Sequence, residues 1–153
     1  MKKPEDRTST NIEVIPATPE QEPVVAHLFQ LYAHDFSEFI DLKLEADGRF
    51  RYDWLPSYWS KQGRHPLLVK VDGNLAGFVL LKQGSEVSGD VNVWDVAEFF
   101  VARGFRRHGI GTAVAHHIWR QFPGGWEVRV MQINDLAQQF WARAIKAFYW
   151  GIN

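Results

Sequence analysis

The stretch that most constrains the fold runs from Val91 to Phe122 and reads VNVWDVAEFFVARGFRRHGIGTAVAHHIWRQF. Its first part, Val91 to Val101, is rich in β-branched and aromatic residues and lacks Gly and Pro, which predicts a strand. Apolar residues then recur at the spacing of a helix with one buried face, at Ile110, Ala113, Val114, Ile118 and Phe122. The stretch therefore predicts a strand, a basic turn that contains glycine, and the start of a helix.

The start of a helix is a natural binding site for an anion. Its first N–H groups have no partner within the helix, and the helix dipole places partial positive charge there. Gly109 and Gly111 let a phosphate approach the backbone closely, and Arg106, Arg107 and His108 add positive charge. We therefore expect this turn to hold a pyrophosphate. Its spacing is neither that of a P-loop nor that of the dinucleotide fingerprint, because no Gly-Lys-Ser/Thr follows and Val114 stands at the third glycine position.

Length and composition fit one domain with its own core, since the chain has 153 residues and 46% of them are hydrophobic. We expect residues 1–10 to be a disordered tail and residues 11–153 to form the single domain. The net charge of −1 argues against general binding of nucleic acid, which calls for a strongly basic face. The absence of cysteine excludes disulfides, thiolate metal sites and an acyl-cysteine intermediate.

The location of the protein is predicted from two further absences. The polar start, MKKPEDRTST, lacks the apolar run of a signal peptide, and no window of the sequence approaches the length of a membrane span. We therefore expect a cytoplasmic protein without a membrane partner.

The rest of the chain predicts alternating strands and helices. Thr18 and Gln21 form a capping box at the start of a first helix, and Asp72-Gly73-Asn74 predicts a hairpin turn. Pro123-Gly124-Gly125 ends the helix of the phosphate turn, and Asn134 caps a last helix that extends to about Phe148. The remaining elements are strands at 11–15, 66–71, 75–81 and 126–130, and a short second helix after His34-Asp35 that includes Phe36, Phe39 and Ile40.

Two motifs in this order resemble those of the GNAT N-acetyltransferase superfamily. Residues 101–111, VARGFRRHGIG, are similar to the family pattern V-x-P-x-x-R-G-x-G-I-G, and residues 134–141 are similar to N-x-x-A-x-x-F-Y. The resemblance covers the chain from about Asn11 to about Phe148. It implies an α+β fold of three layers (α/β/α), with a mixed, mostly antiparallel sheet and helices on both faces. The family's C-terminal pair of strands is absent here or supplied by a partner, and an uncovered sheet edge at that end favours a homodimer.

The resemblance also implies where acetyl-CoA binds. In the family, the fourth and fifth strands splay apart and the pantetheine arm lies in the gap. By resemblance, the backbone of Phe99, Phe100 and Val101 bonds the pantetheine and the acetyl carbonyl, and Asn134 lies beside the pantetheine. The pyrophosphate is held by the turn, which comprises Arg106, Arg107, His108, Gly109, Ile110, Gly111 and Thr112.

The sequence departs from the family motifs at three positions. Arg103 replaces a frequent proline, and Arg107 replaces a frequent glycine. Trp141 stands where many members have a tyrosine that acts as general acid, and an indole N–H is not an acid at neutral pH. The thiolate is then protonated by Tyr149 or by water, or needs no protein acid.

A base is needed, because an alkyl amine resembles lysine, with a pKa of about 10.4, and arrives protonated. Glu98 is our candidate, since strand alternation predicts that it shares a face with Trp94, Val96 and Phe100, where apolar surroundings raise the pKa of a carboxyl group. Asp95, expected on the opposite face with Ala97 and Phe99, is the reserve. Either carboxylate could instead be structural.

The acceptor site is predicted from an aromatic segment. Tyr52, Asp53, Trp54 and Tyr58 suggest a cationic ligand held by aromatic faces and a carboxylate. The same segment could instead be a lid over the core. A metal is not expected, because the adjacent His116 and His117 point about 100° apart on a helix, which is poor ligand geometry.

These observations predict an acetyl-CoA-dependent N-acetyltransferase that transfers an acetyl group to a primary amine by direct attack in a ternary complex. The alternative is a non-catalytic GNAT-like module that binds acyl-CoA as a sensor or interaction domain. The acceptor stays open among a small amine, an amino acid, and the N-terminus or a lysine of a protein.

Overall fold

The computed structural model describes residues 10–130 and 134–150 of the chain. The expected tail therefore lies outside the described residues, apart from Thr10. Along the chain the elements are β1 (Ile12–Pro16), the 3-10 helix η2 (Pro19–Gln21), α1 (Glu22–Phe36), α2 (Ser57–Ser60), β2 (Arg64–Val71), β3 (Asn74–Gln83), β4 (Val93–Val101), the 3-10 helix η3 (Arg103–Phe105), α3 (Ile110–Gln121), β5 (Gly125–Glu127) and α4 (Asp135–Trp150).

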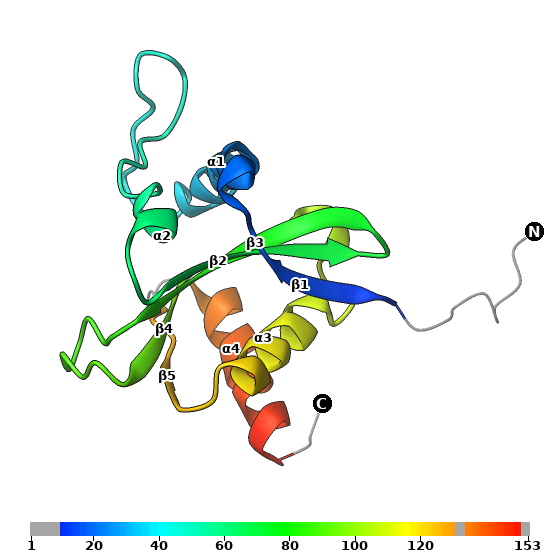
Figure 1. Cartoon of the computed structure of the whole chain (residues 1–153). Coiled ribbons are helices and arrows are strands. Elements are labelled where there is room, and N and C mark those ends of the chain that lie inside the picture. Colours follow the sequence, from blue (N-terminus) through cyan, green and yellow to red (C-terminus); the bar gives the residue numbers. More distant parts are fainter. Residues whose placement is uncertain (1–9, 131–133, 151–153) are drawn as a thin grey trace, which may run out of the picture.

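The strands form one five-stranded sheet in sequence order, β1-β2-β3-β4-β5. The first four are antiparallel to their neighbours, and β5 is parallel to β4. Figure 1 shows α1 and α2 on one face of the sheet and α3 and α4 on the other. The expected α+β fold of three layers, with a mixed sheet and helices on both faces, is confirmed. Within the described residues no further strand follows α4.

Each face of the sheet carries its own hydrophobic core. On the α3 and α4 face, Val79, Val96, Val114, Ile118 and Trp141 are among the buried residues. On the α1 and α2 face the buried residues are Ala17, Val25, Phe29, Ala33, Leu55, Tyr58, Leu68, Phe78, Leu80 and Phe100. Because strand residues alternate between the faces, membership of a core shows to which side a β4 side chain points.

The first helical region differs from the prediction. The Thr18 N–H donates to Oε1 of Gln21 at 2.9 Å, as a capping box requires, but it caps the 3-10 helix η2 that leads into α1. Phe36 is the last residue of α1, and the chain turns at once, so the expected second helix at Phe39 and Ile40 is wrong. The short α2 forms later, where the sequence predicted only an aromatic loop.

A β-bulge in β4 changes the side-chain faces that simple alternation predicts. Leu80 pairs with Glu98 but Leu81 pairs with Val96, so Ala97 is an extra residue in the ladder. Val96 consequently belongs to the α3 and α4 core, whereas Phe100 belongs to the α1 and α2 core. The prediction that Glu98 shares a face with Trp94 and Val96 is wrong; Glu98 shares its face with Phe100 and, across the bulge, with Asp95.

The last pairing in the sheet is short. β5 pairs with β4 through Val93–Gly125, Trp94–Trp126 and Asp95–Glu127, although β4 continues to Val101. The predicted strand at 126–130 is thus confirmed only at its beginning. From Val96 onward β4 has no β5 partner among the described residues, so the two strands part there.

None of the helices in the described part of the chain has the length and apolar character needed to cross a membrane.

Candidate functional site

The parted strands leave one backbone edge of β4 without a strand partner. At the end of the β3–β4 ladder, the Ala102 N–H donates to the Ala76 carbonyl at 2.7 Å, so these two residues form a hydrogen-bonded pair. Antiparallel ladders alternate, so Gly77–Val101 and Val79–Phe99 are the non-hydrogen-bonded pairs of the β3–β4 ladder. The backbone N–H and C=O groups of Phe99 and Val101 therefore point away from β3, toward the side on which β5 begins. An extended ligand can add to such an edge as an extra strand.

The α3 N-terminus follows directly after this edge. Gly109 is the N-cap, in the left-handed region at φ 75°, and no side chain caps the helix. The first N–H groups, of Ile110, Gly111 and Thr112, are therefore available to an anion. At Gly111 a Cβ would lie 2.8 Å from Cε1 of Phe140 in α4, so this glycine allows α3 and α4 to pack closely.

Arg107 adopts a backbone conformation that favours glycine. Its φ of 67° lies in the left-handed region, and its side chain is exposed. A residue other than glycine is disfavoured there by roughly 1–2 kcal/mol. The family's frequent glycine at this position therefore has a physical reason, and the arginine keeps a cation in the turn at the cost of strain.

The guanidinium of Arg106 makes contacts within the protein. Its Nε donates to the Val101 carbonyl at 2.7 Å, and its Nη2 lies 2.7 Å from Oδ2 of Asp35 at the end of α1. Arg103 contacts the other oxygen of Asp35 at 2.6 Å. Although burial opposes the shift, the hydrogen bonds from Arg106 and Arg103 lower the pKa of Asp35. Asp35 thus connects α1 to the turn that precedes α3, through Arg103 and Arg106.

Glu98 lies at the centre of the α1 and α2 side of the site. The Tyr32 hydroxyl donates to its Oε1 at 2.8 Å. Burial raises the pKa of Glu98 to about 7, with a further contribution from Asp95, while the Tyr32 hydrogen bond and the Arg129 charge lower it. A carboxyl group whose pKa is raised this far can take up and release a proton near neutral pH, which is the property that general base catalysis requires.

Tyr32 is held firmly by the aromatic rings around it. Its ring contacts Phe29, Phe36, Phe78 and Phe100, with centroid distances from 4.8 to 6.0 Å. Burial and the neighbouring Glu98 raise its pKa, whereas the backbone N–H of Phe99 lowers it. The hydroxyl therefore lies beside the β4 edge as well as beside the carboxylate.

The four predicted acceptor residues are divided between two environments. Tyr58 is buried and Tyr52 is half buried, and the charge of Glu98 raises the pKa of both, after burial. Asp53 instead pairs with Arg51 at 2.5 Å on the exposed surface, and Trp54 is 45% exposed. The structure thus brings Tyr52 and Tyr58 toward Glu98 and leaves Asp53 and Trp54 outside.

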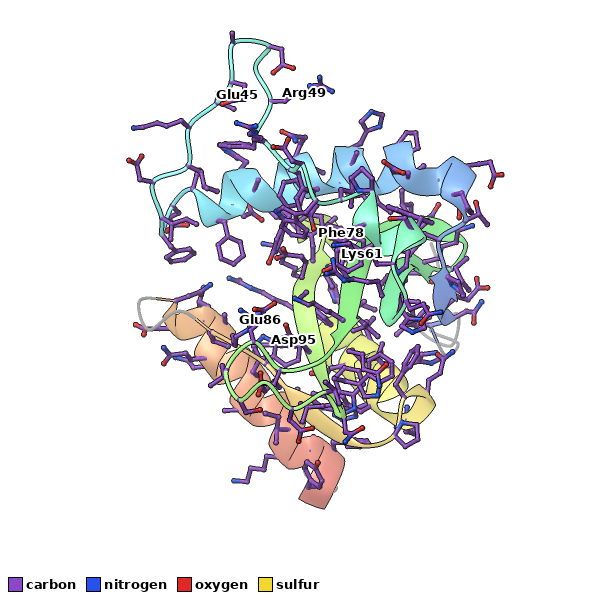
Figure 2. The ribbon with its side chains drawn as sticks, turned by 60° about the vertical axis from the view of Figure 1, so that its left-hand side comes forward. Glu45, Arg49, Lys61, Phe78, Glu86 and Asp95 are labelled. Atoms are coloured by element: carbon purple, nitrogen blue, oxygen red, sulfur yellow. The ribbon has the colours of Figure 1, made fainter. Side chains whose placement is uncertain are left out.

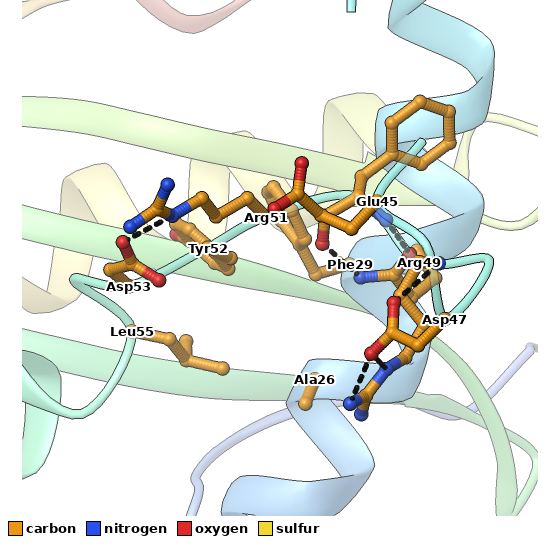
Figure 3. Close-up of a pocket in the computed structure, with 11 residues that line it drawn as sticks. Ala26, Phe29, Glu45, Asp47, Arg49, Arg51, Tyr52, Asp53 and Leu55 are labelled. Carbon is orange, nitrogen blue, oxygen red and sulfur yellow. Dashed lines mark hydrogen bonds and ion pairs between the residues drawn. The ribbon is translucent and has the colours of Figure 1, made fainter. Parts of the chain in front are cut away.

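A separate cavity of about 490 Å³ lies between α1 and the loop that leads to α2 (Figure 3). Its lining residues are Ala26, Phe29, Gln30, Glu45, Asp47, Arg49, Phe50, Arg51, Tyr52, Asp53 and Leu55. Asp47 pairs with Arg49 at 2.8 Å, and Asp53 pairs with Arg51, so most of its charges are already compensated. Figure 2 shows the loop with Glu45 and Arg49 projecting from the α1 layer, far from Asp95.

Neither Trp141 nor Tyr149, both on α4, is placed to act as a general acid. Trp141 is 9% exposed and packs on Phe99, with the ring centroids 4.9 Å apart. Tyr149 is 73% exposed, and its ring contacts Phe148 near the other end of α4. Asn134 is an N-cap, because its Oδ1 accepts the Ala137 N–H at 3.0 Å. A place for Asn134 beside pantetheine stays a prediction.

In the part of the chain that the structure describes, no group of three or more His, Cys, Asp or Glu side chains is arranged so that it could hold a metal ion. His116 bonds the Ala144 carbonyl at 2.8 Å, and His117 bonds Gln121. Both histidines therefore have structural partners on α3 or α4.

Sequence reasoning missed three residues of the site. No pattern in the sequence assigned Tyr32 or Arg129 to the site, and Asp35 was placed only just before the expected second helix. Arg129 lies just after β5, and its Nη2 is 2.6 Å from Oδ2 of the fully buried Asp95. The partners of Tyr32 and Arg129 are 66 and 34 residues away in the sequence, so no local pattern could reveal them.

The strained turn gives a prediction about stability. We expect Arg107→Gly to raise the free energy of unfolding by about 1 kcal/mol, because glycine adopts a positive φ without strain. Urea unfolding checks this. His108→Gly is the matched control, since His108 is also exposed but has no positive φ, and it should lose stability. A less stable Arg107→Gly protein would contradict the strain.

The Tyr32 hydrogen bond gives a prediction about pH dependence. A base works when deprotonated. For the acetyl transfer that the family resemblance implies, with Glu98 as base, the acidic limb of kcat/KM should therefore have its midpoint at about 7. Tyr32→Phe removes a bond that lowers the pKa of Glu98, and the midpoint should rise by roughly one unit. Tyr149→Phe, a hydroxyl removed at an exposed position, should leave it in place. An unmoved midpoint in Tyr32→Phe would show that Glu98 is not the titrating group.

Comparison with known proteins places this geometry in a family. The sequence profile of the acetyltransferase (GNAT) family matches residues 25–145. Among curated protein sequences, none matches the chain significantly.

Solved structures show the same fold at low sequence identity. An aminoglycoside acetyltransferase from an uncultured soil metagenomic sample matches with a TM-score of 0.63 and 14% identity over 88% of this chain and 86% of that one. A GNAT acetyltransferase from Staphylococcus aureus matches with a TM-score of 0.61 and 17% identity, covering 86% and 82%. A ribosomal-protein-alanine N-acetyltransferase from Brucella melitensis matches with a TM-score of 0.52 and 16% identity, covering 88% and 89%. The profile match spans most of the sequence, and the chain therefore belongs to the GNAT acetyltransferase family.

Proposed function

We propose that the protein transfers an acetyl group from acetyl-CoA to a primary amine by direct attack in a ternary complex. One observation carries this proposal: Glu98, with a pKa of about 7, lies where β4 has an unpaired backbone edge. A base and an open strand edge are the two parts that aminolysis of a bound thioester needs.

The donor is proposed from the turn and the edge together. The uncapped α3 N-terminus offers N–H groups to the pyrophosphate, and the exposed Arg107 and His108 add positive charge. The N–H and C=O groups of Phe99 and Val101 offer bonds to an extended pantetheine. Two of these groups already have contacts within the protein. Arg106 donates to the Val101 carbonyl at 2.7 Å, and the Phe99 N–H faces the Tyr32 hydroxyl, whose pKa it lowers.

The chemistry then needs three proton movements and one bond exchange: two protons leave the amine nitrogen, and one reaches the thiolate. An amine with a pKa of about 10.4 gives its proton to Glu98, directly or through water, and its lone pair attacks the thioester carbonyl carbon. The backbone N–H groups at the β4 edge stabilise the developing oxyanion. The C–S bond breaks, and the electron pair leaves with the sulfur as thiolate. The nitrogen, positively charged after its attack, gives up a second proton to water, which leaves the neutral amide.

The leaving thiolate needs no protein acid in this proposal. A thiol has a pKa of about 8.5, so a thiolate is an acceptable leaving group near neutral pH. Tyr32 is a poor proton donor, because its pKa is raised above that of an ordinary phenol and its proton is donated to Glu98. Water then protonates the thiolate.

The alternative is a sensor or interaction module that binds acyl-CoA without catalysis. The packing of Trp141 in the core favours it, because the position of the family's frequent acid contributes to stability here. Binding of acetyl-CoA without transfer to any amine would support this alternative. A cytoplasmic location and a homodimer through the C-terminal end remain part of our proposal.

Calorimetric titration with acetyl-CoA and CoA tests the donor site. Thr112→Glu adds a negative charge in the first turn of α3, where it favours the helix but repels a pyrophosphate. We expect this variant to stay folded and to bind CoA at least about tenfold more weakly. A hydrogen bond to a charged group is worth more than about 1.4 kcal/mol, which corresponds to a tenfold change in Kd, and the added carboxylate opposes such bonds to the pyrophosphate. Thr112→Gln is the neutral control and should bind. No binding by the wild-type protein would contradict the proposal.

Acetyl transfer by Glu98→Gln tests the base. We expect kcat to fall by roughly 10²–10⁴-fold with CoA affinity retained, since general base catalysis contributes that much. Equal kcat in Glu98→Gln and the wild-type protein would remove Glu98 from the mechanism and leave the donor site standing.

A further inference from the structure

Arg129 has a half-exposed side chain above a fully buried partner. The residue lies two positions after the end of β5, near the point where β5 leaves β4. Its side chain is 49% exposed, whereas that of Asp95 is 0% exposed, and the two groups are 2.6 Å apart. The buried carboxylate therefore fixes one side of the guanidinium while the other side faces solvent.

This guanidinium lies on the same side of the sheet as the proposed base. The bulge at Ala97 brings Asp95 to the Glu98 face, and three residues of strand correspond to about 10 Å. The charge of Arg129 lowers the pKa of Glu98 on β4 and also that of Tyr58 on α2. Arg129 therefore lies within electrostatic reach of the space between β4 and α2.

The remaining donors of Arg129 are free within the described residues. An arginine has five N–H donors in a planar fork, and the bond to Asp95 is the one that joins Arg129 to a described residue. Although burial opposes the rise, the charges of two other carboxylates, Glu86 and Glu127, contribute to the raised pKa of Arg129. Both have other partners, because Glu86 pairs with Lys82 and Glu127 accepts a hydrogen bond from Ser85. Figure 2 shows Glu86 and Asp95 at the same end of the sheet.

A cation beside the base is unfavourable for a simple amine. It repels an incoming ammonium group and lowers the proton affinity of Glu98. A substrate that carries its own anion reverses the first effect, because a carboxylate binds the planar fork of arginine with two parallel hydrogen bonds.

We propose that Arg129 is a specificity-determining residue and that the acceptor is an amino acid, its amine directed to Glu98 and its carboxylate to Arg129. The inference rests on the proposed function and narrows it to one class of acceptor. Asp95 orients the guanidinium, and the anion of the substrate replaces solvent on the free side.

Matched acceptor pairs test the inference with acetyl-CoA as donor. Glycine is compared with methylamine, β-alanine with ethylamine, and 4-aminobutyrate with propylamine, so that three separations of amine and carboxylate are covered. We expect kcat/KM to be roughly 10–150-fold higher for the amino acid in at least one pair, the effect of a hydrogen bond between charged groups. Equal rates within every pair would overturn the inference but leave the N-acetyltransferase activity established.

Variants of Arg129 test whether its guanidinium causes the preference for the amino acid over the matched amine. Arg129→Gln should bring the ratio within the preferred pair to near one, mainly through the KM of the amino acid. Because this change leaves the charge of Asp95 buried and unpaired, the double variant Asp95→Asn, Arg129→Gln repeats the test with a neutral pair. Circular dichroism and acetyl-CoA titration confirm that each variant folds and binds the donor.

The remaining outcomes separate the two hypotheses. A preference that persists in both variants would overturn the role of Arg129. A wild-type protein that binds acetyl-CoA but acetylates neither member of any pair would overturn the inference. The proposed function would fall as well only if peptides with a free N-terminus or a lysine are not acetylated either.

Discussion

The candidate site depends on the early separation of β5 from β4. A parallel pair of strands normally satisfies the backbone groups of both, but here the pairing ends after Asp95–Glu127. The edge beyond it, at Phe99 and Val101, must find other partners, and an extended ligand is a suitable one. The α3 N-terminus presents its own free N–H groups a few residues later. Two sets of backbone N–H groups that neither the sheet nor the helix pairs thus follow one another along one stretch of chain.

The bulge at Ala97 brings two carboxyl groups to the same face of the sheet beside this edge. Without the extra residue, Asp95 and Glu98 would lie on opposite faces of the sheet; with it, both face α1 and α2. Burial then raises the pKa of Glu98, and the Tyr32 hydrogen bond and the Arg129 charge limit the rise. Tyr32 and Asp35 lie one turn apart on α1 and contact Glu98 and Arg106 respectively. A single helix therefore positions both halves of the site.

The sequence predicted those features that local patterns encode. Strand, glycine turn and helix follow from residue type and period, and the cap at Asn134 follows from its place before an apolar helix. The face of Glu98 relative to Val96 was predicted wrongly, because a period of two cannot reveal an inserted residue. The bonds of Tyr32 to Glu98 and of Asp95 to Arg129 join residues far apart in the chain, so only the folded structure shows them. The left-handed conformation of Arg107 was likewise hidden, although the glycine of related motifs at that position hinted at it.

The central claim is that the acyl donor binds along the unpaired edge of β4. Amide hydrogen exchange, measured residue by residue by NMR with and without saturating CoA, tests it directly. The account predicts that exchange slows at Val101, whose N–H points to the unpaired edge, while Phe100, which faces β3 in the ladder, keeps its rate. Bound CoA that leaves exchange at Val101 unchanged would contradict the account, because the ligand would then lie elsewhere.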